Sequence, residues 1–187
     1  MKTKSMKLAF LTLCGLILLP HVAGAYEVTD SKAMQLDDNT YLFTISYKFG
    51  FLNRDMATPV LAARNSDVTD KVGYEIEVND APASGIVGAV VLTNDEDVSE
   101  QNSQYVLPEK KNAEFTLVGI VRTASDVEKA VMKITNLPFL IHNNEEVEQS
   151  EVTEDELLEY RSPTLIIGDG GVVSIKTSVV SVNGEIQ

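Results

Sequence analysis

The fold is decided by one stretch of sequence, YLFTISYKFGF at residues 41–51, in which large side chains recur at every second position. Five aromatic residues and one isoleucine share a parity, namely Tyr41, Phe43, Ile45, Tyr47, Phe49 and Phe51. A period of two residues is typical of a strand with one buried face. An aromatic row can also stack against sugars or bases, but the opposite parity is the polar one and suits the wet side of a sheet. We therefore expect this strand to anchor the core, since burial of each large side chain contributes about 1.5–3 kcal/mol.

The remaining chain alternates between short apolar segments and turn residues. Val72–Val78 also has period two and is followed by the turn sequence NDAP at residues 79–82. Ile86–Leu92 is almost continuously apolar, which predicts a more central strand. Further strands are expected at residues 115–121, at 131–141 with an interruption at Pro138 that indicates an edge or a bulge, and at 164–167 and 172–182 on either side of a glycine-rich hairpin loop.

One short helix is expected between two of these strands. Thr153 and Glu156 form a capping box, and Val152 and Leu157 occupy the two positions of a hydrophobic staple. Pro163 ends the helix after about two turns. With seven to nine short strands and no βαβ alternation, the sequence predicts an all-β protein, an antiparallel β-sandwich of immunoglobulin-like or jelly-roll type with one short helix on a connection.

The first 25 residues have the pattern of a secretory signal peptide. Residues 1–7 are basic, residues 8–19 are apolar, and Ala23 and Ala25 offer the small side chains that a signal peptidase accepts. The apolar segment is too short to cross a bilayer, which takes about 20 residues. We therefore expect residues 1–25 to be cleaved and residues 26–187 to form a single exported domain, periplasmic or extracellular, without membrane insertion.

Charge limits the class of partner. The chain has 15 Lys+Arg against 28 Asp+Glu, a formal net charge of −13, and without the three lysines of residues 1–25 the net charge is 12 − 28 = −16. Recognition of phosphate needs clustered basic residues, so the composition argues against nucleic acid and against anionic lipid as partners. The single cysteine, Cys14, lies in the expected signal peptide. The mature chain would then have no disulfide and no thiolate metal site.

The motifs of the common catalytic sites are missing from the sequence. One histidine remains after residue 25, His142, and we expect it at the surface where a strand ends. The chain contains no H-E-x-x-H, no G-x-S-x-G and no G-x-x-x-x-G-K-[ST]. Acids are plentiful, but a glycosidase pair is defined by a spatial separation of about 5–9.5 Å, which a sequence does not supply. We expect a protein that is not an enzyme, with a carboxylate-based hydrolase as an alternative.

Calcium is the one cofactor that the sequence suggests. Asp95, Asp97 and Glu100 lie in the segment NDEDVSE at residues 94–100, and Ca²⁺ takes about six to eight oxygen ligands. The segment is not an EF-hand, because Glu100 stands at the glycine position and Val106 at the position of the bidentate glutamate. Weaker candidates are four acids that are also common turn residues, Asp37, Asp38, Asp67 and Asp70.

These observations favour an exported, non-enzymatic binding or structural module of the cell envelope or extracellular layer, with a protein partner or self-association. Residues 145–159 hold eight acids, which we interpret as solvated surface. Assembly by strand addition is one expected mode, because residues 26–36 would be free after cleavage and sandwich edges accept strands. The alternatives are a calcium-dependent extracellular binding module and the carboxylate-based hydrolase.

Overall fold

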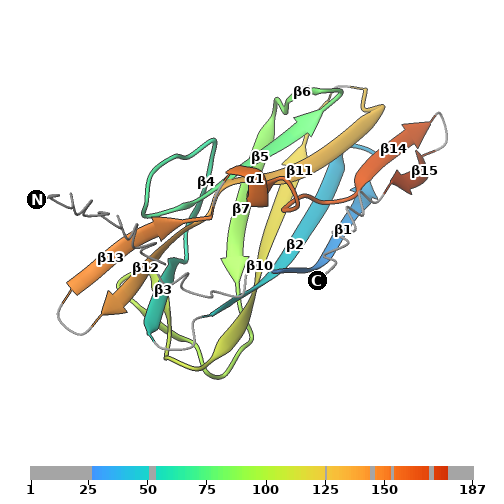
Figure 1. The fold of residues 1–187 in the computed structure, drawn as a ribbon. Helices are drawn as coiled ribbons and strands as arrows, with labels where there is room; N and C mark the ends of the chain where they lie inside the picture. Colours follow the sequence, from blue (N-terminus) through green and yellow to red (C-terminus); the bar gives the residue numbers. More distant parts are fainter. Residues whose placement is uncertain are drawn as a thin grey trace, which may run out of the picture.

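The computed structural model describes residues 27–50, 54–124, 126–143, 146–152, 154–168 and 171–176, and these residues are mostly in strands (Figure 1). The four-stranded sheet has the order β1 (Glu27–Asp37), β2 (Thr40–Gly50), β10 (Asn112–Arg122) and β7 (Ile86–Leu92). The six-stranded sheet has the order β15 (Gly171–Lys176), β14 (Thr164–Gly168), β11 (Lys129–Asn136), β5 (Val72–Val78) and β4 (Ala62–Arg64), with the short β6 (Ala81–Pro82) also paired to β5. The five-stranded sheet has the order β13 (Glu146–Glu151), β12 (Pro138–Asn143), β3 (Asp55–Pro59), β9 (Gln104–Leu107) and β8 (Ser99–Gln101).

The protein is therefore all-β, as predicted, with several antiparallel sheets of which none closes on itself. One pair departs from the antiparallel pattern, because β4 runs parallel to β5. The expected signal peptide at residues 1–25 and the strand residues 177–182 lie outside the described part of the chain.

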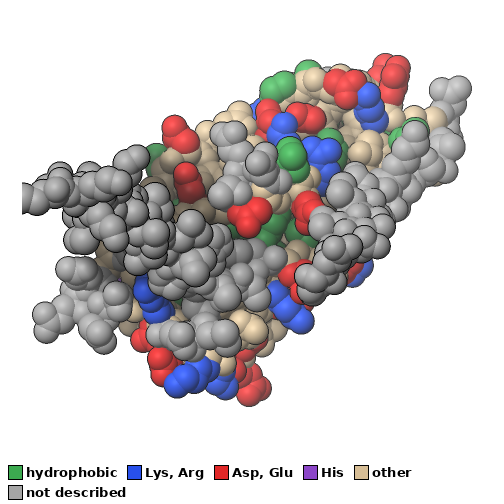
Figure 2. Space-filling model, in the orientation of Figure 1, with side chains coloured by type: hydrophobic (Ala, Val, Ile, Leu, Met, Phe, Trp, Pro, Cys, Tyr) green, Lys and Arg blue, Asp and Glu red, His purple; other side chains and the backbone are tan. Residues whose placement is uncertain are grey.

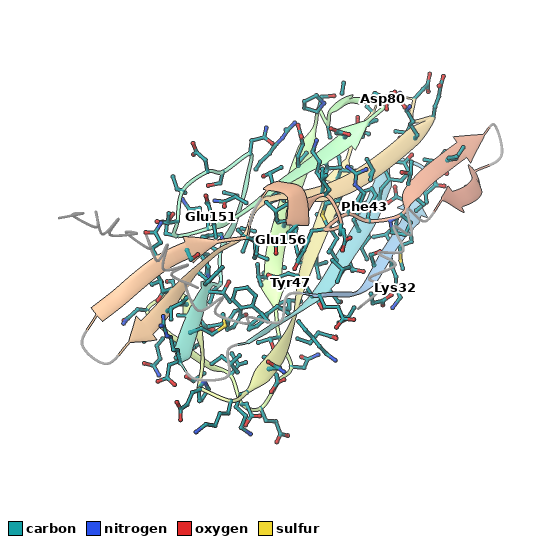
Figure 3. All side chains as sticks on the ribbon, viewed as in Figure 1. Lys32, Phe43, Tyr47, Asp80, Glu151 and Glu156 are labelled. Atoms are coloured by element: carbon teal, nitrogen blue, oxygen red, sulfur yellow. The ribbon has the colours of Figure 1, made fainter. Side chains whose placement is uncertain are left out.

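The aromatic stretch forms β2 and lies at the centre of the core. Its inward residues Tyr41, Phe43, Ile45, Tyr47 and Phe49 are at most 2% exposed. The prediction of one buried face is thus confirmed, while Phe51 lies outside the described residues. β2 pairs with β1 on one side and with β10 on the other, so that Phe43 is opposite both Ala33 and Gly119. Figure 3 shows Phe43 and Tyr47 within the molecule, whereas Lys32 and Asp80 lie at its margins.

The four-stranded and six-stranded sheets pack against each other through this row. A Cβ atom placed on Gly119 of β10 would lie 2.3 Å from Met132 Sδ and 3.4 Å from Ile76 Cδ1, so side chains of β11 and β5 reach the backbone of β10. The ring centroids of Tyr47 and Tyr160 are 5.9 Å apart. The Tyr160 carbonyl in turn accepts a hydrogen bond from the backbone N–H of Ile134 on β11. The largest buried side chains therefore fill the space between these two sheets.

The five-stranded sheet extends the same core at one end of the molecule (Figure 1). Phe139 of β12 meets Phe49 edge-on with ring centroids 5.0 Å apart, and Tyr105 of β9 lies 5.7 Å from Phe115. Most of this sheet was not predicted, and the expected seven to nine strands fall short of the fifteen found in the described residues. Apart from the eleven-residue β1, the missed strands have two to six residues, too few for a period of two to be recognised.

Several local predictions are confirmed. Val72–Val78 is β5, and it ends at a two-residue turn in which Asn79 and Asp80 both have positive φ, the type I′ geometry of tight hairpins. Residues 115–121 lie within β10, whose side chains alternate between buried and more exposed positions. β14 and β15 form the expected hairpin from Thr164 opposite Lys176 to Gly168 opposite Gly171. The loop residues between them, 169 and 170, lie outside the described part.

Two predictions about strands are wrong. Ile86–Leu92 has the expected bounds, but β7 is an edge strand of its sheet and not a central one. Residues 131–141 form two strands, β11 and β12, that belong to different sheets. The chain leaves the six-stranded sheet at the buried Leu137, and Pro138, which cannot donate to a ladder, is the first residue of β12.

Two further predictions differ from the structure: one concerns the segment at residues 26–36, and the other the length of the helix. The segment expected to be free after cleavage is β1, which pairs with β2 from Glu27 opposite Lys48 to Asp37 opposite Thr40. The helix α1 (Glu154–Leu157) has a single turn in place of the expected two. It ends early because the following backbone bonds to β11, with Ser162 N–H donating to the Met132 carbonyl. The predicted N-cap, Thr153, lies outside the described residues.

Candidate interaction surface

The residues predicted to bind calcium are engaged in other contacts. The Asp97 N–H donates to Asp95 Oδ1 at 3.0 Å, and Lys111 Nζ donates to Asp97 Oδ2 at 2.9 Å. Glu100 lies in β8, opposite Tyr105 of β9. Within the described ranges, no three His, Cys, Asp or Glu residues form a group that could hold a metal ion. The geometry adds no support to calcium, which stays a prediction.

The acids at the turn between β1 and β2 have a structural role. The Asn39 N–H donates to Asp37 Oδ1 at 2.9 Å. This bond, with a second one from the Thr40 side chain, holds the pKa of the exposed Asp37 carboxyl below its ordinary value. Asp37 also lines an open cavity of about 750 Å³ together with Asp38 and Asp126. A glycosidase acid needs a raised pKa, so the shift of Asp37 is in the wrong direction for that role.

Other polar residues singled out from the sequence lie at the surface. His142 is exposed on β12, one residue before the strand ends, as predicted. From the acidic stretch at 145–159, Glu151, Glu156 and Glu159 are exposed. Figure 3 labels Glu151 and Glu156 near α1, while Glu145 lies outside the described residues. These positions agree with a solvated acidic surface.

The most unusual surface of the described chain is the outer side of the four-stranded sheet, which turns away from the core. Large apolar side chains on its outward positions are exposed: Ile86 71%, Leu92 47%, Val90 43%, Met34 42% and Ile120 39%. The strand register brings them together, because Val118 is opposite Val90 and Leu42 is opposite both Met34 and Ile120. We call the outward side chains of Leu42, Ile86, Val90, Leu92, Val118 and Ile120 the uncharged face. Contiguous exposed apolar side chains of this kind mark interaction sites.

Charged residues avoid this part of an otherwise acidic chain. The strands β2, β7 and β10 contain one acid, Glu114, although the chain has 28 acids. Their two bases, Lys48 and Arg122, stand at the margins, with Lys48 opposite Glu114 and Arg122 opposite Ile86. Electrostatic repulsion between acidic molecules is therefore weakest at the uncharged face.

The two edges of the four-stranded sheet are built differently. β1 carries four charged residues and two register irregularities, features that discourage pairing with another chain. β7 has the sequence IVGAVVL, without a charge or a proline, and its register with β10 is regular. Among the described strands β7 pairs with β10 alone, and β4 lies close to it without pairing. β7 is thus a seven-residue, regularly paired and uncharged edge of the kind that other proteins protect.

Sequence reasoning missed this surface because a continuous apolar run is also typical of a buried strand. A usable signal was present in β10, where Leu117, Val118, Ile120 and Val121 are apolar on both parities. An apolar residue on the outward parity of a half-buried strand indicates that a partner covers the outer side of the sheet.

No model of a known protein family matches the chain, and a search of curated proteins finds no match. Within the described part of the chain, no helix is long and apolar enough to cross a membrane.

Proposed function

We propose that this protein is an exported, non-enzymatic β-sandwich of immunoglobulin-like or jelly-roll type that serves as a binding or structural module of the cell envelope or extracellular layer. It acts by contact with protein, and the uncharged face with the β7 edge is the docking surface. The observation that carries the proposal is the concentration of exposed apolar side chains on three acid-poor strands, β2, β7 and β10, of which β7 is an unprotected edge. Solvent exposure of such a patch is unfavourable, so a partner that covers it gains the hydrophobic contribution.

The two alternatives have weaker support. A hydrolase needs two facing carboxyl groups, one of them with a raised pKa. The acid with a resolved shift in the open cavity of about 750 Å³, Asp37, has a lowered pKa. A calcium module needs several oxygens directed at one point, whereas Asp97 is paired with Lys111. A rise in melting temperature on addition of Ca²⁺, reversed by chelator, would restore the calcium alternative.

The test uses the full chain, tagged at its C-terminus and produced in its own cells. The N-terminus of the exported fraction is determined by mass spectrometry, and we expect it to begin at Tyr26. Native gel separation of gently lysed cells should place the wild-type protein in a species larger than the monomer. Ile120→Lys, on the uncharged face, should shift it to a smaller species.

The matched control is Leu158→Lys, which also charges an exposed apolar side chain but lies just after α1 and off the uncharged face. It should leave the large species intact. A wild-type protein that migrates as a monomer in these extracts would count against the proposed function. So would a complex that both variants disturb equally.

A further inference from the structure

The open edge of β7 requires a partner with unpaired backbone groups of its own. The segment once expected to supply a strand, residues 26–36, already forms most of β1 within its own sheet. Apart from the two-residue β6, the other edge strands of the described chain each carry at least one charged residue, and two of them, β4 and β8, have only three residues. Within the described part, β7 itself is the one edge strand that combines seven residues with no charge. The best match to β7 among the described strands is therefore another β7.

We propose that β7 pairs with β7 of a second copy of this chain around a two-fold axis, which joins the two four-stranded sheets into one continuous sheet. This inference rests on the proposed function and names the partner of the β7 edge, while the outward side chains of β2 and β10 stay uncovered in the pair. An isologous contact uses the same edge of both copies. It leaves no β7 edge free, so assembly stops at the dimer.

The sequence of β7 suits antiparallel pairing with itself. An axis through Ala89, the central residue, gives the full overlap of the strand. It places Ile86 opposite Leu92 of the second copy and Gly88 opposite Val90 of the second copy. A Cβ atom built on Gly88 meets nothing within 4 Å, so the space above Gly88 can take the larger valine. Apolar cross-strand pairs of this kind stabilise antiparallel ladders.

Electrostatics restrict self-association to this surface. Each copy has a formal net charge of −13, so most approaches between two copies are repelled. The strands β7 and β10 carry one acid between them, Glu114 at the far end of β10 from Arg122. Salt screens the residual repulsion, and we therefore expect the dimer to strengthen as salt is added. A basic partner would show the opposite dependence, because salt weakens an attraction between unlike charges.

The experiment uses the full chain expressed with its own N-terminus, purified from the exported fraction and followed by sedimentation velocity over a range of concentrations. The wild-type protein should form a dimer with a dissociation constant that falls as NaCl is raised. Val90→Lys places a lysine in the middle of the edge, which is the common natural device against edge pairing. It should raise the dissociation constant by at least about tenfold.

The matched control is Val172→Lys on β15, another edge strand, because Val172 is 41% exposed and Val90 is 43% exposed. The control should keep the wild-type dimer. Both side chains are exposed to a similar degree, so both variants should keep the wild-type circular dichroism spectrum. Their melting temperatures should equal that of the wild type at concentrations where the wild type is monomeric, because dimerisation itself raises the melting temperature. Hydrogen exchange should then show protection of residues 86–92 that increases with concentration in the wild type and in Val172→Lys, but not in Val90→Lys.

Several outcomes would overturn the pairing. They are a wild-type monomer at every concentration, a dimer that Val90→Lys leaves intact, growth beyond the dimer, or weaker association at higher salt. If the purified protein is monomeric while the cell extract still contains an Ile120-dependent complex, self-pairing is wrong and the proposed function stands with a different partner. If the extract also contains the monomer alone, both proposals fail.

Discussion

The outer surfaces of the two sheets that enclose the aromatic core are chemically opposite. On the six-stranded sheet, Lys133 Nζ lies 2.8 Å from Glu75 Oε2 and 2.6 Å from Glu77 Oε1, and Lys129 pairs with Asp80. Figure 2 shows acidic and basic side chains interspersed at the end of the molecule where Figure 1 places β5, β6 and β11. The four-stranded sheet instead carries the uncharged face. Ion pairs cross the outer surface of the six-stranded sheet, whereas on the four-stranded sheet the ion pair Lys32–Asp30 is confined to the edge strand β1.

This difference shows where functional information lies in a protein whose antiparallel sheets share a core. The inner sides of both sheets must be apolar to form the core, so β2 and β5 resemble each other on that side. The outer side has no such requirement. Glu75 and Glu77 alternate with buried residues as the solvent side of a strand ordinarily does, whereas Val118 and Ile120 do not. The apolar side chains on the outer side of β10 and β7 are the exception to this rule, and they indicate a partner.

The largest effect on the free energy of unfolding is expected from a substitution that removes a large side chain from the core that the two sheets share. Phe43 is fully buried between the sheets and is opposite Ala33 and Gly119 in the register. Phe43→Ala should lower the free energy of unfolding by about 3–5 kcal/mol, through lost burial and the cavity left behind. Urea denaturation followed by fluorescence and by circular dichroism should report one shared midpoint. Two separate transitions would show that the sheets fold independently and that the comparison concerns two units.

A smaller effect on the free energy of unfolding is expected from adding a methyl group to the four-stranded sheet, and it should differ between the inner and the outer side of the sheet. A Cβ at Gly119 would lie 2.3 Å from Met132 Sδ, whereas a Cβ at Gly88 meets nothing within 4 Å. Gly119→Ala should therefore cost about 1–3 kcal/mol, toward the low end because a methionine side chain adapts. Gly88→Ala should be neutral or stabilise by up to about 1 kcal/mol. Equal effects in urea denaturation would contradict the assignment of inner and outer sides.

The charged outer surface can be tested at Lys133. Removal of its ammonium in Lys133→Met leaves two half-buried carboxylates without their shared cation, and we expect a loss of about 1–2 kcal/mol at neutral pH. The exposed pair Lys32–Asp30 on β1 is the matched control, and Lys32→Met should not change the unfolding midpoint measurably. If both variants behave alike, the ion pairs of the six-stranded sheet contribute no more than ordinary surface pairs.

The same lysine predicts a dependence on alkaline pH. The hydrogen bond from Lys133 to Glu75, and to a smaller extent the one to Glu77, raises the pKa of Lys133 above its ordinary value. A group whose pKa is higher in the folded state stabilises the protein fully below its unfolded pKa, here about 10.4, and that stability is lost as pH rises through the folded pKa. Thermal melts between neutral pH and strongly alkaline pH should show a shallower decline for Lys133→Met than for the wild type.

The sequence predicts long, half-buried strands well. Tyr41–Phe49 and Val72–Val78 alternate over enough residues for the period to exceed chance, and the turn at Asn79 and Asp80 follows from residues that tolerate positive φ. The short strands β3, β8 and β9 lack that length, and the partners of β3, which are β9 and β12, are distant in sequence. Their sheet depends on tertiary contacts such as that between Phe49 and Phe139.

The candidate surface was harder to predict than the fold. Whether Ile86–Leu92 is central or at an edge depends on which strands pair beside it, and the run itself is compatible with both. The calcium candidates Asp95, Asp97 and Glu100 are close in sequence, but a turn and an ion pair to Lys111 engage two of the carboxylates. In both cases the missing information is the identity of a distant neighbour.

The smallest effect is expected inside the core, where a polar group lies between the two sheets. Among the described residues the buried Tyr47 hydroxyl has no hydrogen-bond partner, and neither has that of Tyr160. Tyr47→Phe removes an unpaired donor, so at neutral pH the free energy of unfolding should stay the same or rise by up to about 1 kcal/mol. The control is Tyr41→Phe, which removes a hydroxyl that donates to the Asp38 carbonyl at 3.2 Å and should cost about 0.5–1.5 kcal/mol.

Alkaline pH makes this small difference measurable. Burial raises the pKa of Tyr47, so the folded protein keeps its phenol neutral while the unfolded chain ionises near pH 10. The wild type should therefore lose stability as pH rises above about 10, and Tyr47→Phe should lose less, because it has no phenol at this position to ionise. Urea denaturation at neutral pH and above pH 10 measures both. If Tyr47→Phe is as destabilising at neutral pH as Tyr41→Phe, the Tyr47 hydroxyl has a partner, and the interior between the two sheets is more polar than the described contacts indicate.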